Sequence, residues 1–203
     1  MASPSSAPPP ASSSPFRVTA AGKTDVGRVR DHNEDKLLLS PELGLFVVAD
    51  GMGGHNAGEV ASALAALSLE NCYRVSRTEP LPSDLTEDPR PLSHDARCLL
   101  GAARKANSDV FEISKTHAEH KGMGTTLVAV AVSRPTSEIS IAHVGDSRCY
   151  RVRGGKIEQL TRDHSLVGDA LAWKPDLTEA EIALLPKNII SRALGRGTSV
   201  EID

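Results

Sequence analysis

The chain has 203 residues, a formal net charge of -3, and 39% hydrophobic residues, which fits one domain with a real core. The nearly neutral, mixed charge and the 3% aromatic content argue against a nucleic-acid binder or a polybasic membrane anchor. No apolar run approaches the ~20 residues that span a bilayer, so we expect no membrane association. The three cysteines are widely spaced and form no CxxC pair, which predicts reduced thiols in a cytoplasmic protein rather than a thiolate zinc site.

The first 15 residues differ in composition from the rest. After Met1 they contain only Ala, Ser and Pro, and such a segment cannot bury enough apolar surface to offset its ordering entropy. We therefore predict a disordered tail over 1–15 and a folded domain over 16–203. The N-terminus has no basic region followed by an apolar one, so a secretory signal is not expected.

The first half of the domain predicts strands followed by two long helices. Short apolar runs rich in β-forming residues indicate strands, helical spacing of Ala and Leu indicates helices, and clustered prolines indicate a loop. On this basis, strands are expected over 26–39 and 43–49, helices over 59–75 and 93–116, and a loop over 78–91.

The second half reads mainly as strands joined by hairpins. Strands are expected over 125–132, over 138–152 with an interruption at Gly145-Asp146-Ser147, and over 156–160 after a Gly-Gly turn. A mobile excursion is expected over 162–186 with a short helix at 178–185, and another short helix over 188–194. Hairpins between strands, with long helices between strand groups, favour an α+β fold: a layered sandwich of two antiparallel sheets flanked by helices.

Asp50 is the strongest candidate for chemistry. It ends the apolar strand in Val48-Ala49-Asp50-Gly51, and a carboxylate at the edge of a core is costly unless it is paired or bound to metal. Its oxygens and a backbone carbonyl from Gly51 would suit a hard divalent cation. An ordinary Asp-Gly turn explains the dipeptide equally well. A nucleotide phosphate loop is the other alternative, but Asn56 stands where its fingerprint needs Gly, and no Gly-Lys-Ser/Thr follows.

Two further acidic clusters accompany Asp50. The first spans 30–35 and holds Arg30, Glu34 and Asp35; Arg30 lies four residues before Glu34, and its planar fork suits a phosphate monoester. The second places Asp146 after a glycine within an alternating strand. Each cluster alone is also what a solvated turn looks like.

Taken together, five segments resemble the metal-dependent type 2C serine/threonine protein phosphatases in their compact bacterial form. They occur in the family's order and span nearly all of 22–203. The segments are 24–35 (TDVGRVRDHNED), 48–55 (VADGMGGH), 122–126 (GMGTT), 144–148 (VGDSR) and 160–165 (LTRDHS).

The resemblance implies a fold and a reaction. The family fold is a sandwich of two antiparallel sheets flanked by helix pairs, with two Mn²⁺ or Mg²⁺ ions in a cleft at one edge. The implied reaction is hydrolysis of phosphoserine and phosphothreonine on proteins by a metal-activated water. The expected substrates are proteins phosphorylated by a serine/threonine kinase. We expect the enzyme to be a monomer.

The resemblance also implies roles for individual residues. Asp50 would bridge the two ions and Gly51 would offer its carbonyl. Glu34 and Asp35 would hold metal-bound waters, Arg30 would grip the phosphate, and Asp146 would reach a third, weaker ion. The segment 163–188 would be a flap beside the cleft.

The chain departs from the family pattern in two places. Met52 stands where some members carry a histidine proposed as general acid; His55 is nearby. The family's last third supplies two more aspartates, in a Ser-Asp-Gly strand end and an Asp-Asn pair, and neither sequence occurs here. We therefore expect a form truncated at the C-terminus that lacks the last strands of the sandwich and binds metal more weakly than a longer form. The alternative function is an inactive phosphatase-like domain that binds phosphoproteins or a kinase.

Overall fold

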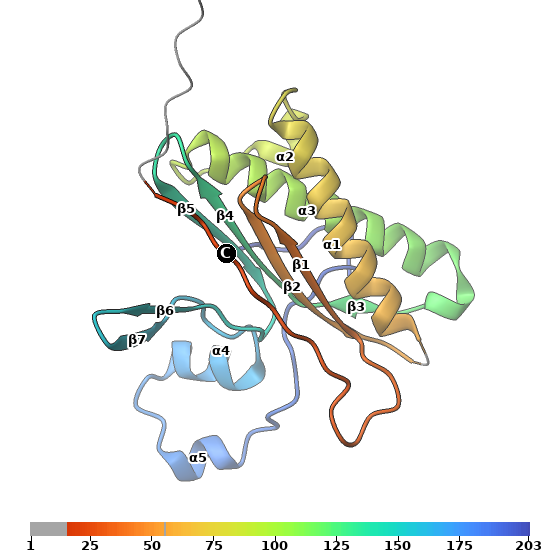
Figure 1. Ribbon diagram of the computed structural model, residues 1–203. Coiled ribbons are helices and arrows are strands. Elements are labelled where there is room, and N and C mark those ends of the chain that lie inside the picture. The colour runs from red at the N-terminus through yellow and green to blue at the C-terminus, as the bar shows by residue number, and fades with distance from the viewer. Residues whose placement is uncertain (1–15, 55) are drawn as a thin grey trace, which may run out of the picture.

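The computed structural model describes residues 16–54 and 56–203 (Figure 1). The tail predicted over 1–15 and the candidate acid His55 lie outside the described residues. No helix in the described part of the chain is both long and apolar enough to cross a bilayer.

An antiparallel sheet forms the centre of the fold. Within the described residues it has five strands, in the order β1-β2-β4-β5, and β3 pairs with the end of β2. These are β1 (Asp35–Ser40), β2 (Leu45–Met52), β3 (Gly124–Thr125), β4 (Leu127–Ser133) and β5 (Glu138–Val144). A separate hairpin consists of β6 (Tyr150–Arg153) and β7 (Lys156–Gln159).

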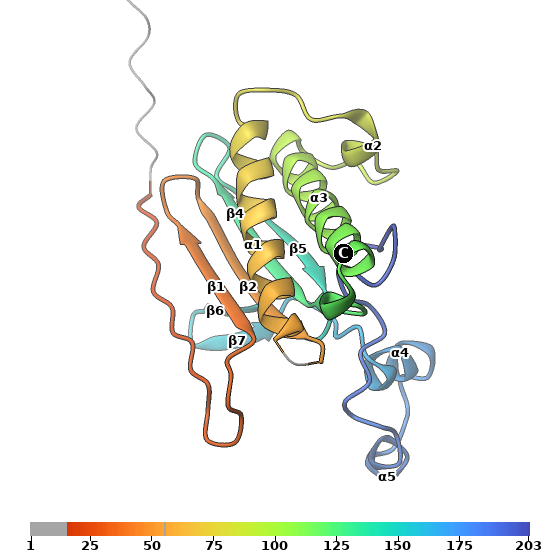
Figure 2. The ribbon, with the colours of Figure 1, turned by 90° about the vertical axis from the view of Figure 1, so that its right-hand side faces the viewer.

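Two long helices cover one face of this sheet (Figure 2). They are α1 (Ala57–Ser76) and α3 (His94–Thr116), and alanines along both helices let them pack closely. The shorter elements are α2 (Ser83–Thr86), the 3₁₀ turn η1 (Ala118–His120), α4 (Leu166–Trp173) and α5 (Glu179–Ala183). The last two belong to the segment that follows the β6–β7 hairpin and lie away from the α1–α3 layer (Figure 1).

The alternation of β2 decides which side chains reach the site. Leu45, Val47 and Ala49 are buried and belong to the core that α1 and α3 cover. Because successive strand residues point to opposite faces, Val48 and Asp50 project from the other face. The strand therefore carries its terminal carboxylate away from the helical layer, to the side of the sheet that the helices leave open.

The core of α1 makes a first prediction about stability. Leu69 is 0% exposed, whereas Leu67 on the same helix is 50% exposed. Leu69→Ala is expected to lower the free energy of unfolding by about 2–5 kcal/mol, because it removes buried methyl groups and leaves a cavity. Leu67→Ala is the matched control and is expected to cost about 1 kcal/mol or less. Urea unfolding of both variants measures this difference, and equal losses would contradict the assigned burial.

The α+β class with antiparallel sheets flanked by helices is confirmed, and several local predictions are corrected. The short helix predicted over 188–194 is wrong: this stretch makes isolated bridges, Ser165 with Ile190 and Thr125 with Leu194. The strand predicted over 138–152 is divided between the large sheet and the hairpin. Helix α4 was not predicted, although Ser165 caps it by accepting a hydrogen bond from the Gly168 N–H.

Candidate metal centre

The two acids from the first two strands face each other. β1 and β2 are antiparallel, and their register places Asp35 directly opposite Asp50 at the end of the sheet. Directly opposed residues share a face, so both carboxylates lie on the open side. Burial first, and then the Asp35 carboxylate, raise the pKa of Asp50, while the charge of Arg30 opposes this shift. The pair is therefore a site where a cation would be strongly favoured.

Two threonines hold the backbone of Asp50. The Asp50 carbonyl accepts hydrogen bonds from the Thr126 N–H and the Thr125 hydroxyl, both at 2.9 Å. The Asp50 N–H donates to the Thr126 hydroxyl oxygen, also at 2.9 Å. Because both backbone groups are satisfied by neighbouring chain segments, the Asp50 side chain is left free to face the site. This arrangement also interrupts the strand predicted over 125–132 at Thr126.

A close backbone approach forms the floor next to Asp50. A Cβ added to Gly51 would lie 1.9 Å from the Gly58 carbonyl oxygen, and the Gly51 N–H donates to the Glu34 carbonyl at 3.0 Å. At Gly58 an added Cβ would lie 2.2 Å from Oε1 of Glu34. Glycine is therefore required at position 51, where backbone atoms leave no room for a Cβ, and a Cβ at position 58 would displace the Glu34 carboxylate.

The predicted phosphate ligand lies beside this floor. Nη1 of Arg30 is 3.7 Å from Oε2 of Glu34, and the Arg30 side chain is 64% exposed. Arg30 is also among the groups whose charge acts on Asp50. The guanidinium is thus near the acidic pair but still has donors free for an anion from solvent.

The third acid comes from the loop after β5. Asp146 is close enough for its charge to raise the pKa of Asp50 further, behind the contributions of burial and Asp35. The neighbouring Ser147 hydroxyl is 2.7 Å from the Thr126 hydroxyl, which in turn binds the Asp50 N–H. One threonine therefore links the loop of Asp146 to the end of β2.

The structure thus brings together the five charged side chains that the sequence analysis proposed for the site. Arg30, Glu34, Asp35, Asp50 and Asp146 meet at one end of the sheet, and Gly51 lies beside them. Asp50 and Asp146 are half-buried and Asp35 is exposed. Carboxylates near one another are the oxygen donors that Mn²⁺ and Mg²⁺ accept, so the residues fit these ions. Among the described residues, the acids at 35, 50 and 146 do not form a set of ligand atoms within 4.8 Å of one another. That spacing suits more than one ion, with water completing each shell, better than one fully caged ion.

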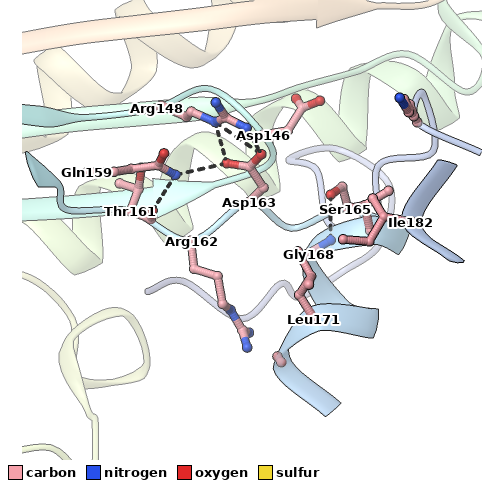
Figure 3. A pocket seen from close by; sticks show the side chains of 13 residues that line it. Asp146, Arg148, Gln159, Thr161, Arg162, Asp163, Ser165, Gly168, Leu171 and Ile182 are labelled. Atoms are coloured by element: carbon pink, nitrogen blue, oxygen red, sulfur yellow. Dashed lines mark hydrogen bonds and ion pairs between the residues drawn. The ribbon is translucent and has the colours of Figure 1, made fainter. Parts of the chain in front are cut away.

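A cavity of about 690 Å³ extends from Asp146 towards α4 and α5. In Figure 3 Arg148 and Asp163 form a hydrogen-bonded pair next to Asp146, and Gln159 donates to the same carboxylate. The hydrogen bonds from Arg148 hold the pKa of Asp163 below its usual value. Arg162 also lines the cavity but has an exposed side chain. The cavity is therefore a polar hollow that opens next to the acidic end of the sheet.

Sequence reasoning missed a polar cluster near Asp146 that contains two buried histidines. Ligand atoms of His143, His164 and Asp203 lie within 4.8 Å of one another, and the two imidazole rings are 4.5 Å apart between centroids. Burial lowers the pKa of His143, which is only 2% exposed. The LTRDHS segment marked His164 only as part of a family pattern, and its contact with Gly145 crosses 19 residues of sequence.

Comparison with known proteins gives a consistent result. Residues 28–170 match the sequence profile described as Protein phosphatase 2C. The chain is 36% identical over 184 residues to the serine/threonine phosphatase stp of Listeria monocytogenes. This match covers 89% of this chain and 68% of that protein.

Solved structures agree with the sequence match. The PPM Ser-Thr phosphatase MsPP of Mycobacterium smegmatis, crystallised in complex with cacodylate, superposes with a TM-score of 0.73 at 34% identity, over 92% of this chain and 71% of that one. The catalytic domain of the phosphatase PstP, in complex with two manganese ions, superposes with a TM-score of 0.66 at 32% identity, over 89% and 69%.

Proposed function

Because the chain belongs to the protein phosphatase 2C family of metal-dependent serine/threonine phosphatases, we propose that Asp35, Asp50 and Asp146 form the carboxylate wall of its metal centre. The reaction is hydrolysis of phosphoserine and phosphothreonine on proteins. The observation that carries the proposal is the pairing of Asp35 with Asp50 across β1 and β2, with the charge of Asp146 added to theirs.

In this proposal each residue of the site has a distinct role. When bound, Mn²⁺ or Mg²⁺ lowers the pKa of a coordinated water towards neutrality and polarises the phosphoryl oxygens. Asp50 would supply charged oxygens to the ions, Asp35 opposite it would hold their coordinated water, and the Gly51 carbonyl would be a further ligand. Glu34 pairs with Arg30 and orients its guanidinium, and its carboxylate would also hold metal-bound water. Arg30 binds a phosphoryl oxygen and stabilises the negative charge that grows on it during hydrolysis.

We also propose the number of metal ions, the substrates, the compartment and the oligomeric state. Two ions occupy the centre and a weaker third lies at Asp146. The substrates are proteins phosphorylated by a serine/threonine kinase, in the cytoplasm, and the enzyme is a monomer. Cys72, Cys98 and Cys149 are free thiols, which supports a reducing compartment.

The direct test is phosphate release from a phosphothreonine peptide with and without Mn²⁺. We expect turnover that depends on Mn²⁺ and is lost in chelator. Binding of the peptide without any phosphate release would contradict the proposal and support a phosphoprotein-binding domain instead.

Arg30 gives a more specific prediction. Arg30→Ala is expected to lower kcat/KM about 100-fold, because a preorganised donor to the developing charge is lost. Arg28→Ala is the matched control: Arg28 is exposed on the same segment two residues earlier, and its loss is expected to leave the kinetics nearly unchanged. Steady-state kinetics on the phosphothreonine peptide measure both, and equal kinetics for the two variants would exclude Arg30 as the phosphate ligand.

A further inference from the structure

His164 contacts the backbone of Gly145 through two different groups. Its ring Nδ1 accepts a hydrogen bond from the Gly145 N–H at 3.1 Å, and its own N–H donates to the Gly145 carbonyl at 2.8 Å. Gly145 immediately precedes Asp146 and has a φ of 106°, a conformation that favours glycine. Both polar groups of this residue are therefore fixed by a single side chain and its backbone.

The remaining polar groups of His164 are fixed as well. Its Nε2 lies 3.1 Å from Oδ2 of Asp203, and its carbonyl accepts the Ser191 N–H at 2.9 Å. Asp203 is itself held, because its N–H and carbonyl exchange hydrogen bonds with the backbone of His143 and its other oxygen accepts from Arg192 at 3.0 Å. His164 is 0% exposed, so water does not compete with these partners for hydrogen bonds to the ring.

These contacts determine which ring nitrogen carries the proton. A backbone N–H is always a donor, so Nδ1 must present its lone pair to Gly145, and the proton of the neutral ring is on Nε2. Nε2–H then donates to the Asp203 carboxylate. The ring is thus a hydrogen-bond relay between Asp203 and Gly145: Nε2–H donates to Asp203, and Nδ1 accepts from Gly145.

We infer that His164 is a positioning residue for the metal centre: by holding Gly145 at both backbone groups it sets the direction of Asp146, and Asp203 holds its ring in the required orientation. This inference rests on the proposed function, in which Asp146 is a metal ligand. Because carboxylates act as ligands only within a narrow geometry, loosening the residue before one is expected to weaken metal binding.

The cluster of His143, His164 and Asp203 does not suit a metal ion of its own. A metal on Nε2 would have to displace the proton that Asp203 accepts, while Nδ1 is already occupied by Gly145. The Arg192 guanidinium, 3.5 Å from Nε2, would also repel a cation there. The cluster is therefore better described as a hydrogen-bond relay.

Two substitutions separate the contact with Gly145 from the contact with Asp203. In His164→Asn, the amide oxygen lies near the position of Nδ1 and can still accept the Gly145 N–H. In His164→Gln, the amide lies near the position of Nε2, so it can still contact Asp203 but leaves Gly145 without its acceptor. Both replacements are polar and of similar size, which makes them matched controls for each other.

The main experiment is calorimetric titration of Mn²⁺ into the wild type and both variants, with melting temperatures measured in chelator. We expect His164→Gln to weaken Mn²⁺ binding at the weaker Asp146 site about 10- to 100-fold, the range for a partner that orients a ligand, and His164→Asn to stay within about threefold of wild type at that site. Equal Mn²⁺ affinities for the two variants would overturn the inference.

A remote variant controls for lost stability. Asp95 is buried and pairs with Arg77 at the end of α1 that is about 30 Å from the acids, given 1.5 Å per helical residue. Asp95→Asn is expected to lower the melting temperature without changing Mn²⁺ affinity. If instead affinity falls in proportion to melting temperature across all the variants, His164 has only a structural role.

A measurement on the unmodified protein keeps the test decisive even if His164→Gln does not fold. Long-range ¹H–¹⁵N spectra of the metal-free wild type are expected to show the His164 proton on Nε2 and a Gly145 amide protected from hydrogen exchange. A proton on Nδ1, or rapid exchange at Gly145, would overturn the inference. A Mn²⁺-binding event additional to those at the acidic end of the sheet, abolished by Asp203→Ala, would show a metal site in place of the relay.

The outcome also separates this inference from the proposed function. A wild type that releases no phosphate with Mn²⁺ would contradict the function, while the spectra would still decide the relay. An active wild type whose two His164 variants bind Mn²⁺ equally would contradict the relay alone.

Discussion

Asp50→Asn is expected to lower Mn²⁺-dependent phosphate release by more than about 100-fold, because even the partners of metal ligands cost 10- to 100-fold when removed. In chelator the same variant is expected to be more stable than the wild type. Burial and the charges of Asp35 and Asp146 raise the pKa of Asp50, so the ionised carboxylate is unfavourable in the metal-free fold near neutral pH. Removing one charge relieves that repulsion.

The stability gain expected for Asp50→Asn in chelator can be expressed as a shift in melting temperature. If the relieved repulsion is about 1 kcal/mol, the melting temperature rises by about 2–4 °C for a chain of this length. Added Mn²⁺ is expected to stabilise the wild type and to leave Asp50→Asn unchanged. Thermal melts with and without Mn²⁺ measure both effects.

A control distinguishes the acidic end of the sheet from any surface acid. Asp84 lies on α2, and Asp84→Asn is expected to change neither activity nor the Mn²⁺ response. A wild-type response to Mn²⁺ that persists in Asp50→Asn would contradict the role assigned to Asp50.

Gly51→Ala adds only one methyl group but is expected to disrupt the packing around the site. Its Cβ would lie 1.9 Å from the Gly58 carbonyl oxygen and 2.8 Å from the Glu34 carbonyl oxygen. These are backbone atoms, so α1 or the segment before β1 has to move. We expect destabilisation of at least about 1–3 kcal/mol, the usual cost of overpacking, together with loss of Mn²⁺-dependent activity.

The glycine-rich turn itself supplies the matched control for this prediction. At Gly54 an added Cβ meets nothing within 4 Å, so Gly54→Ala is expected to be nearly neutral for stability. Urea unfolding and phosphate release on the two variants give the comparison. A Gly51→Ala protein as stable and active as Gly54→Ala would show that the close approach of β2, α1 and Glu34 does not form the site.

Much of the fold could be predicted from local patterns. The alternation around β2 and the helical spacing of α1 and α3 reflect burial against one layer, and such burial leaves a direct mark on the sequence. The helix predicted over 188–194 failed because these residues bond to distant partners, Ser165 and Thr125, which no local pattern encodes.

The candidate site was predicted as separate clusters whose geometry the sequence does not contain. Asp50 was evident as an acid at the end of an apolar strand. Its position opposite Asp35 depends on the register of β1 and β2, which the turn between them sets. The role inferred for His164 was missed because it depends on a contact with Gly145 and on the carboxylate of Asp203, 39 residues away.

Anomalous diffraction from crystals grown with Mn²⁺ tests the central claim most directly. The account predicts manganese peaks within coordination distance of the Asp50 carboxylate, on the open face of the sheet where Asp35 faces it. Crystals with saturating Mn²⁺ and no peak at Asp50, or a peak only at the His143, His164 and Asp203 cluster, would contradict it.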